Sequence, residues 1–111
     1  METLETDRRV LRTLFNEWQA WPQQAHFKVI PVWDETNNRY LLLMIGWDGY
    51  RREHGVLVHI ELHGGLFWIE ADQTPEGFAR DLEAVGIPKE RIVLAFKHPE
   101  LRRLSQYAQA A

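Results

Sequence analysis

The chain has 111 residues, an apolar fraction of 45% and a formal net charge of −3. This size and composition predict a single domain over residues 1–111 and exclude an intrinsically disordered chain. The absence of cysteine excludes a disulfide framework, a thiol nucleophile and thiolate zinc sites, and it favours a reducing cytoplasm. Because phosphate binding depends on clustered Lys and Arg, the acidic balance predicts that DNA is bound only indirectly or weakly.

No segment is predicted to enter or cross a membrane. The N-terminal segment carries Glu2, Glu5 and Asp7 without an apolar stretch, and the longest apolar run, residues 40–45, is far too short to span a bilayer. We therefore expect a cytoplasmic protein.

The first predicted element is an amphipathic helix over residues 3–21. Its apolar side chains recur at helical spacing, with charged residues mainly between them. Pro22 ends this helix, because proline cannot continue the hydrogen-bond ladder. A strand follows over residues 27–33, and Pro31 places it at an edge of the sheet because proline lacks a ladder donor.

Residues 40–45 form a continuous apolar run, which in a strand predicts that both faces are covered. We expect helices on one face and a further layer or a second subunit on the other, and hence a homo-oligomer. Asp48-Gly49 predicts a type I′ hairpin turn. The return strand is expected to reach His63, with a bulge at Gly55.

A second tight hairpin is predicted at Gly64-Gly65, followed by a strand over residues 66–71. Thr74 is expected to cap a second helix, with Pro75 at its first position. Gly86 is expected to end this helix, because glycine readily takes the positive φ of a helix terminus.

A short fifth strand is predicted over residues 92–96, and Pro99 is expected to open a C-terminal helix to about Tyr107. The predicted fold class is therefore α+β: an N-terminal helix, a four-stranded antiparallel β meander, a helix, a short fifth strand and a C-terminal helix.

One candidate site lies on the predicted third strand. If Val56, Val58, Ile60 and Leu62 face the core, then His59, Glu61 and His63 share the opposite face, about 7 Å apart in successive steps. Two imidazoles and a carboxylate could hold a metal ion with open coordination positions. The same alternation is also expected of any half-buried antiparallel strand, where these residues would face solvent or a partner.

A second candidate site follows the first hairpin. Arg51, Arg52 and His54 could bind phosphate or the carboxylates of a partner, because guanidinium groups match both geometries. The alternative is that Glu53 and neighbouring acids already neutralise these side chains.

The five tryptophans are expected to divide between core and surface. Trp18, Trp47 and Trp68 are predicted to pack in the core, whereas Trp21 and Trp33 lie beside chain turns and could anchor a partner. No nucleophile, base and orienting residue form a recognisable catalytic motif, and no cofactor-binding fingerprint is present. We therefore expect a protein that is not an enzyme and carries no cofactor.

Several segments along the chain form a recognisable series. They are Gly46-Trp47-Asp48-Gly49, Arg51-Arg52, His54-Gly55 and His59, then Phe67-Trp68-Ile69, Asp72, Thr74, Gly77 and Ala79, then Gly86-Ile87-Pro88-Lys89, residues 92–96 and Pro99-Glu100-Leu101-Arg102. In order and spacing these segments resemble the XisI family, and the likeness extends over nearly the whole chain. The family lends no catalytic residues to carry over.

The resemblance implies a role like that of the fdxN element excision controlling factor, an accessory protein for site-specific removal of a DNA element in cyanobacteria. It also implies a XisH-like partner, whose fold is similar to that of restriction-type endonucleases. Three alternatives remain open at this stage. One is an antidote that inhibits a nuclease-like partner, and another is a small metal-dependent enzyme that uses His59, Glu61 and His63. The third is direct DNA binding through the Arg51–Arg52 hairpin, which would weaken steeply with salt.

Overall fold

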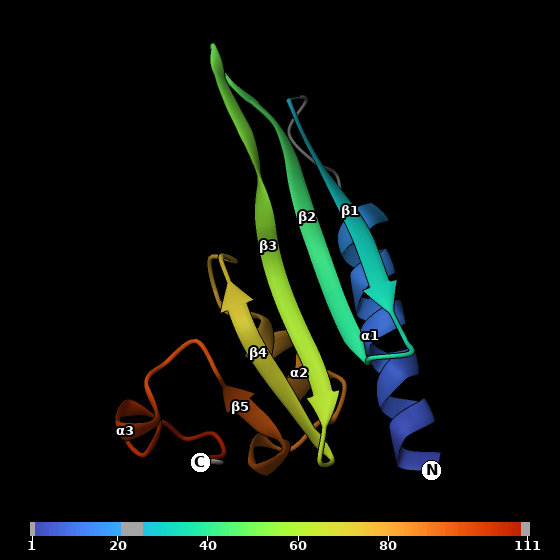
Figure 1. The fold of residues 1–111 in the computed structure, drawn as a ribbon, viewed down its shortest axis with the longest axis vertical. Coiled ribbons are helices and arrows are strands. Elements are labelled where there is room, and N and C mark those ends of the chain that lie inside the picture. The colour runs from blue at the N-terminus through green and yellow to red at the C-terminus, as the bar shows by residue number, and fades with distance from the viewer. Residues whose placement is uncertain (1, 21–25, 110–111) are drawn as a thin grey trace.

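The computed structural model describes residues 2–20 and 26–109, which form one five-stranded sheet with helices behind it (Figure 1). The strands lie in the order β1-β2-β3-β4-β5; the first four are antiparallel neighbours and β5 is parallel to β4. The predicted α+β fold is confirmed. The elements are α1 (Glu2–Ala20), β1 (Phe27–Asp34), β2 (Arg39–Asp48), β3 (Arg51–His63), β4 (Leu66–Asp72), α2 (Phe78–Ala84), a 3₁₀ turn (Lys89–Arg91), β5 (Ile92–Leu94) and α3 (Pro99–Arg102).

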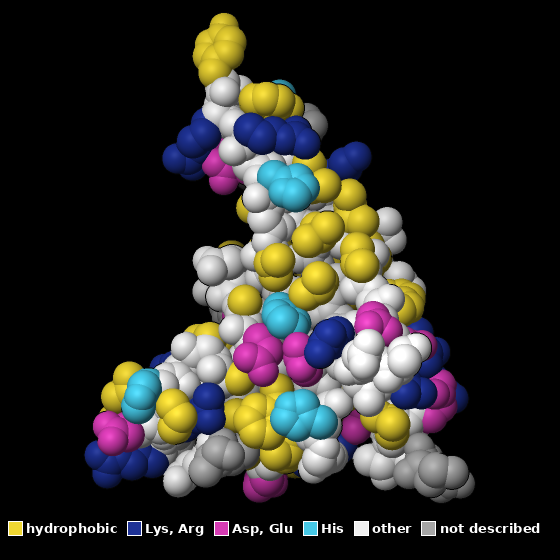
Figure 2. Space-filling model, viewed as in Figure 1, with side chains coloured by type: hydrophobic (Ala, Val, Ile, Leu, Met, Phe, Trp, Pro, Cys, Tyr) yellow, Lys and Arg dark blue, Asp and Glu magenta, His cyan; other side chains and the backbone are white. Residues whose placement is uncertain are grey.

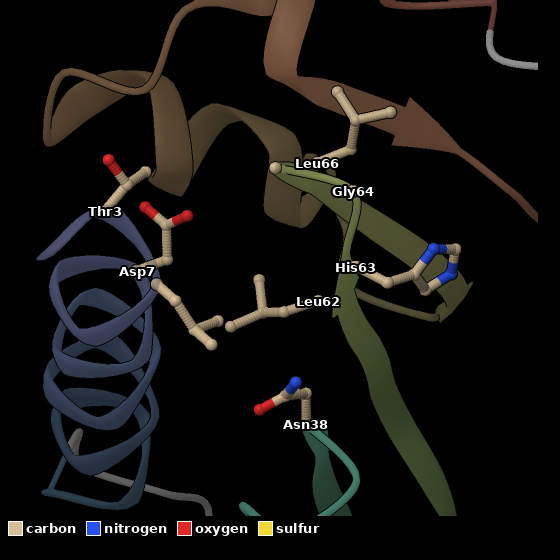
Figure 3. A pocket seen from close by; sticks show the side chains of 9 residues that line it. Thr3, Asp7, Asn38, Leu62, His63, Gly64 and Leu66 are labelled. Atoms are coloured by element: carbon tan, nitrogen blue, oxygen red, sulfur yellow. The ribbon is translucent and has the colours of Figure 1, made fainter. Parts of the chain in front are cut away.

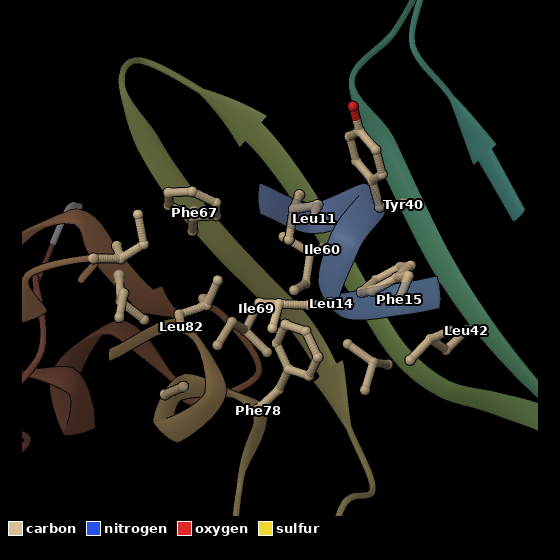
Figure 4. Close-up of a cluster of buried hydrophobic side chains, with 14 of the residues drawn as sticks. Leu11, Leu14, Phe15, Tyr40, Leu42, Ile60, Phe67, Ile69, Phe78 and Leu82 are labelled. Carbon is tan, nitrogen blue, oxygen red and sulfur yellow. The ribbon is translucent and has the colours of Figure 1, made fainter. Parts of the chain in front are cut away.

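The core lies between the sheet and the helices α1 and α2 (Figure 4). Phe15 of α1 is fully buried and meets Tyr40 and Phe78 edge-on, at ring-centroid distances of 6.2 and 5.6 Å. Such aromatic packing is stabilising beyond the area it buries. The predicted N-terminal helix is confirmed to Ala20, whereas Trp21 and Pro22 lie outside the described residues.

Polar contacts fix α1 to the turn between β1 and β2. Arg8 donates to Asn38 Oδ1 at 2.8 Å, and Arg12 donates to Glu35 Oε2 at 2.9 Å. Glu35 also accepts a hydrogen bond from the Tyr40 hydroxyl. Burial alone would raise the pKa of Glu35, but the hydrogen bonds from Tyr40 and Arg12 outweigh it, so that this pKa is lowered.

The hairpin formed by β2 and β3 projects beyond the helices, and we call residues 46–55 the hairpin arm (Figure 1). The predicted hairpin exists, but its turn lies one residue later than expected. The loop is Gly49-Tyr50, and of these two residues only Gly49 has a positive φ, at 63°. The prediction of a type I′ turn at Asp48-Gly49 is therefore wrong, because that turn needs two positive φ angles. The predicted Gly64-Gly65 turn is confirmed, with φ values of 63° and 75°.

The bulge in β3 lies at Leu57, which has no partner on β2, and not at Gly55 as predicted. An extra residue reverses the alternation of side chains along a strand. Val56 is consequently 40% exposed, whereas Val58 is fully buried. The expectation that Val56 shares the core face with Val58 is therefore wrong.

The second helix begins at Phe78, after the predicted start at Thr74-Pro75. Its N-cap is Gly77, which offers no side chain, and the Asp72 carboxylate accepts the Phe78 N–H at 2.6 Å instead. Asp72 also accepts the Thr74 N–H at 2.9 Å, which holds Thr74 in a turn outside the helix.

The C-terminal part of the chain follows the predicted order with shorter elements. Gly86 has a φ of 100° directly after the C-cap of α2, as expected. The fifth strand spans only Ile92–Leu94 and α3 ends at Arg102, so the predicted helix to Tyr107 is too long. Edge strand β1 contains Pro31, as predicted. Within residues 2–20 and 26–109, no helix is long and apolar enough to cross a membrane.

Stability is expected to fall above pH 10 because of Tyr107. Its hydroxyl donates to Glu83 Oε2 at 2.5 Å, and burial together with this hydrogen bond raises the pKa of Tyr107 to about 12. The unfolded chain loses this proton near pH 10 and the folded chain near pH 12. The stabilisation is therefore complete below pH 10 and is lost as the pH rises towards 12. Thermal melts should show a smaller alkaline decline for Tyr107→Phe than for the wild type.

The remaining alkaline decline of that variant is assigned to Tyr40. Burial, followed by the hydrogen bond to Glu35, raises the pKa of Tyr40 as well. An identical alkaline decline in Tyr107→Phe and the wild type would contradict the role of Tyr107.

Candidate partner-binding surface

In the part of the chain that the structure describes, no helix covers one face of the sheet, and we call it the open face (Figure 1). Strand pairing brings its side chains into five rows across β1, β2 and β3. Seen from this side, apolar side chains occupy the middle of the sheet (Figure 2). From the arm downwards, the rows are Trp47/Arg52, Lys28/Ile45/His54, Ile30/Leu43/Val56, Val32/Leu41/His59 and Asp34/Arg39/Glu61.

The exposed apolar side chains of the open face are unusual for a lone domain. Val32 is 43% exposed and Val56 is 40% exposed, and Ile30, Leu41 and Leu43 are only partly buried. Contiguous apolar surface of this kind marks an interaction site more often than a solvated face. The apolar run in β2 therefore has helices on one side only, and the expected second layer is absent from the described residues.

The arm brings cationic and aromatic groups together at one end of the open face. The Arg52 guanidinium lies 5.1 Å from the centroid of the Trp47 ring and pairs with no carboxylate among the described residues. Trp47 is 49% exposed, so its predicted place in the core is wrong. Within residues 2–20 and 26–109, no helix covers the part of the arm that projects beyond α1 and α2 (Figure 1).

Arg51 faces away from Arg52, because successive residues of a strand point to opposite faces. Its guanidinium pairs with Glu53 at 2.7 Å and with Asp48 at 3.7 Å. The sequence-based alternative, in which neighbouring acids neutralise the basic side chains, therefore applies to Arg51. Arg52 and His54 lie on the open face, so the structure does not gather the three predicted basic residues into one cluster.

His59, Glu61 and His63 share the open face of β3, as predicted, but make separate contacts. His59 Nε2 lies 3.0 Å from Glu61 Oε2, and Glu61 also lies 3.6 Å from Arg39 Nε. His63 stacks on Trp68 with ring centroids 4.4 Å apart. Among the described residues, no three His, Asp or Glu side chains are grouped to hold a metal ion. Metal binding remains a hypothesis that metal analysis of the purified protein would test.

A pocket of about 390 Å³ lies between the first turns of α1 and the β3–β4 turn (Figure 3). Asp7 lines it, but its carboxylate is already paired with Arg91. Figure 3 shows the His63 ring pointing away from Asp7. The pocket therefore presents no acid and base pair to a substrate, and the open face and the arm are the stronger candidates for function.

A family model described as XisI protein matches residues 1–109. The chain belongs to the XisI family. The match covers the helix, the meander with its hairpin arm and the C-terminal segment, so the XisI likeness seen in the sequence is confirmed over nearly the whole chain. No curated protein matches the chain significantly.

Two crystal structures from Anabaena variabilis ATCC 29413 share the XisI fold. A XisI-like protein is 25% identical with a TM-score of 0.79, and the match covers 97% of this chain and 99% of that one. The fdxN element excision controlling factor XisI is 29% identical with a TM-score of 0.65, covering 96% and 94%. The chain is therefore a XisI-like protein, related to a factor that controls fdxN excision.

Several residues of the open face escaped the sequence interpretation. Ile30, Val32 and Val56 were assigned to strands without a surface role, because apolar side chains normally indicate core. One signal could have identified them. Two neighbouring strands of the meander are apolar on both faces, and the predicted helices are too few to cover both faces of the sheet. The unpredicted bulge at Leu57 concealed the place of Val56.

Proposed function

We propose that this XisI-family protein is a non-catalytic accessory subunit that binds a XisH-like, nuclease-fold protein and so regulates its action on DNA. The observation that carries the proposal is the exposed tip of the hairpin arm. Tyr50 is 103% exposed there, at the end of a hairpin that projects beyond the helices. The relation to an fdxN excision controlling factor supports a regulatory role.

The arm presents Tyr50 at the end of a continuously paired hairpin. Strand pairing continues to Asp48 and Arg51, directly beside the Gly49-Tyr50 loop. Tyrosine is enriched among residues that dominate protein interfaces. Beside the tip, the pairing of Arg51 with Glu53 reduces the attraction of that guanidinium for phosphate.

The proposal predicts that Tyr50→Ser weakens binding of a co-expressed XisH-like protein by roughly tenfold or more, which is the loss expected for an interface anchor. The matched control is Leu104→Ser, because Leu104 is also strongly exposed, at 76%, and lies in the C-terminal segment. Affinity should be measured by calorimetry after co-purification. Equal binding by both variants would place the contact elsewhere, and a well-folded partner that never associates would refute the function.

An antidote role uses the same contact but has a different consequence. If the chain inhibits a toxic nuclease-like partner, co-expression should relieve growth inhibition, and Tyr50→Ser should restore the toxicity. A partner that is harmless when expressed alone would favour the excision-control role. Either role fits the cysteine-free composition of a cytoplasmic protein, and the net charge of −3 favours indirect contact with DNA.

A further inference from the structure

We infer that the open face of the sheet binds a second copy of this chain in an antiparallel, face-to-face dimer. The middle row, Ile30/Leu43/Val56, is entirely apolar and has two rows on either side of it. A twofold axis through this row would place apolar side chains against apolar side chains. Closed twofold dimers are the commonest assemblies of soluble proteins, and their interfaces must be self-complementary.

The charges at the two ends of the open face are self-complementary. The two rows nearest the arm tip hold Lys28 and Arg52 and no carboxylate. The row at the far end holds Asp34 and Glu61 against one cation, Arg39. Because Arg52 and Glu61 each lie two rows from the middle, an antiparallel copy brings Arg52 of one chain to Glu61 of the other.

A parallel arrangement would place like charges together. With the twofold axis along the strands, rows of the same level would meet, so Glu61 would face Asp34 and Arg39 would face Arg39, which is unfavourable in a desolvated interface. The charge pattern therefore selects the antiparallel orientation. Two sheets that pack face to face in this way lie about 10 Å apart, with strand directions close to alignment.

The size of the open face fits a modest dimer interface. Five rows over three strands give a footprint of about 27 by 15 Å, from the ordinary spacings within and between strands. The accessible area of a corrugated side-chain layer exceeds its footprint and is on the order of the 600–800 Å² per partner found in the smaller stable interfaces. We therefore expect a dimer that dissociates on dilution.

The first test is the mass of the full chain alone across a dilution series from about 200 to about 1 µM, measured by analytical ultracentrifugation. The dimer should dissociate reversibly. Leu43→Glu should raise its dissociation constant on the order of 100-fold, because each interface then buries two unpaired carboxylates. The control is Leu104→Glu, which adds the same charge at an exposed apolar residue outside the open face and should leave the constant unchanged.

The second test uses charge reversal and is independent of the apolar substitution. Arg52→Glu places a carboxylate opposite Glu61 of the other copy, and Glu61→Lys places a cation opposite Arg52 of the other copy. Each variant alone should be a monomer at concentrations where the wild type is a dimer, whereas an equimolar mixture should form a heterodimer. Thermal melts confirm that each variant is folded.

A monomer at every wild-type concentration would overturn the inference. Charge variants that fail to associate when mixed would also overturn it, because the antiparallel heterodimer pairs residue 52 of each chain with an oppositely charged residue 61 of the other. If Leu43→Glu instead abolishes binding of the XisH-like protein and leaves the oligomeric state unchanged, the open face belongs to that partner and the inference is wrong. Because the dilution and mixing experiments use the chain alone and leave Tyr50 intact, a failure to form the dimer does not bear on the proposed function.

Discussion

Gly46→Ala is expected to lower the free energy of unfolding by about 3 kcal/mol, the upper end of the cost of overpacking. A Cβ atom at this position would lie 2.0 Å from the His26 carbonyl oxygen and 2.6 Å from Cδ1 of Phe27. The carbonyl cannot withdraw freely, because it accepts the Trp47 N–H at 3.0 Å. The substitution therefore separates β1 from β2 at the base of the arm, and urea unfolding measures the loss.

The control for this prediction is Gly55→Ala on the same hairpin. A Cβ at Gly55 has no heavy atom within 4 Å, and Gly55 does not need a positive φ. This variant should be neutral or gain up to about 1 kcal/mol, because alanine restricts the unfolded chain. Equal stability of the two variants would contradict the close approach at Gly46.

Asp7→Ala is expected to cost about 2 to 3 kcal/mol of stability. Asp7 is only 3% exposed, and its carboxylate accepts a hydrogen bond from Arg91. Arg91 is held in place by the Gly65 carbonyl at 3.0 Å and lies 5.4 Å from the centroid of the Phe67 ring. Removal of the carboxylate leaves a partly buried guanidinium without its counter-charge, at a cost below the ~3–5 kcal/mol of a fully buried pair because Arg91 is 27% exposed.

The matched control is Glu76→Ala, which breaks an exposed ion pair. Arg80 lies 2.9 Å from Glu76, and both side chains are mostly in solvent. Exposed pairs of this kind contribute at most about 0.5 kcal/mol within one turn. Chemical denaturation of both variants should separate them clearly, and a comparable small loss for both would show that the Asp7–Arg91 contact is not structurally important.

Much of the fold could be predicted because its signals are local. Pro31 excludes a central strand, Gly64-Gly65 supplies two positive φ angles, and Gly86 ends α2. Each of these constraints acts within one or two residues, where the sequence states it directly. The order of the elements follows from such signals.

The errors came from contacts that are distant in sequence or from a change of register. The start of α2 is fixed by Asp72, six residues before Phe78, instead of by the local capping signal at Thr74. The bulge at Leu57 has no glycine or proline to announce it. The position of the hairpin turn depends on the pairing of Asp48 with Arg51 rather than on the Asp-Gly pair itself.

The candidate surface was predicted only in part. The face shared by His59, Glu61 and His63 follows from strand alternation and is seen in the structure. The exposure of Trp47 could not be predicted from the sequence. An aromatic residue on a strand normally packs in the core, but Trp47 lies where the strand extends past the core. That extension depends on the lengths of the helices, which become known only when the helices are placed on the sheet.

The unpaired Leu57 divides β3 into two segments whose side-chain alternation is independent. A residue inserted or lost near the tip would reverse the faces of the arm, while Val58 and Ile60 would stay in the core. We therefore expect that the arm can be exchanged as a unit without a change in the core face of β3. Arms from other XisI-family chains could be transplanted at this boundary to transfer binding specificity without redesign of the helical layer.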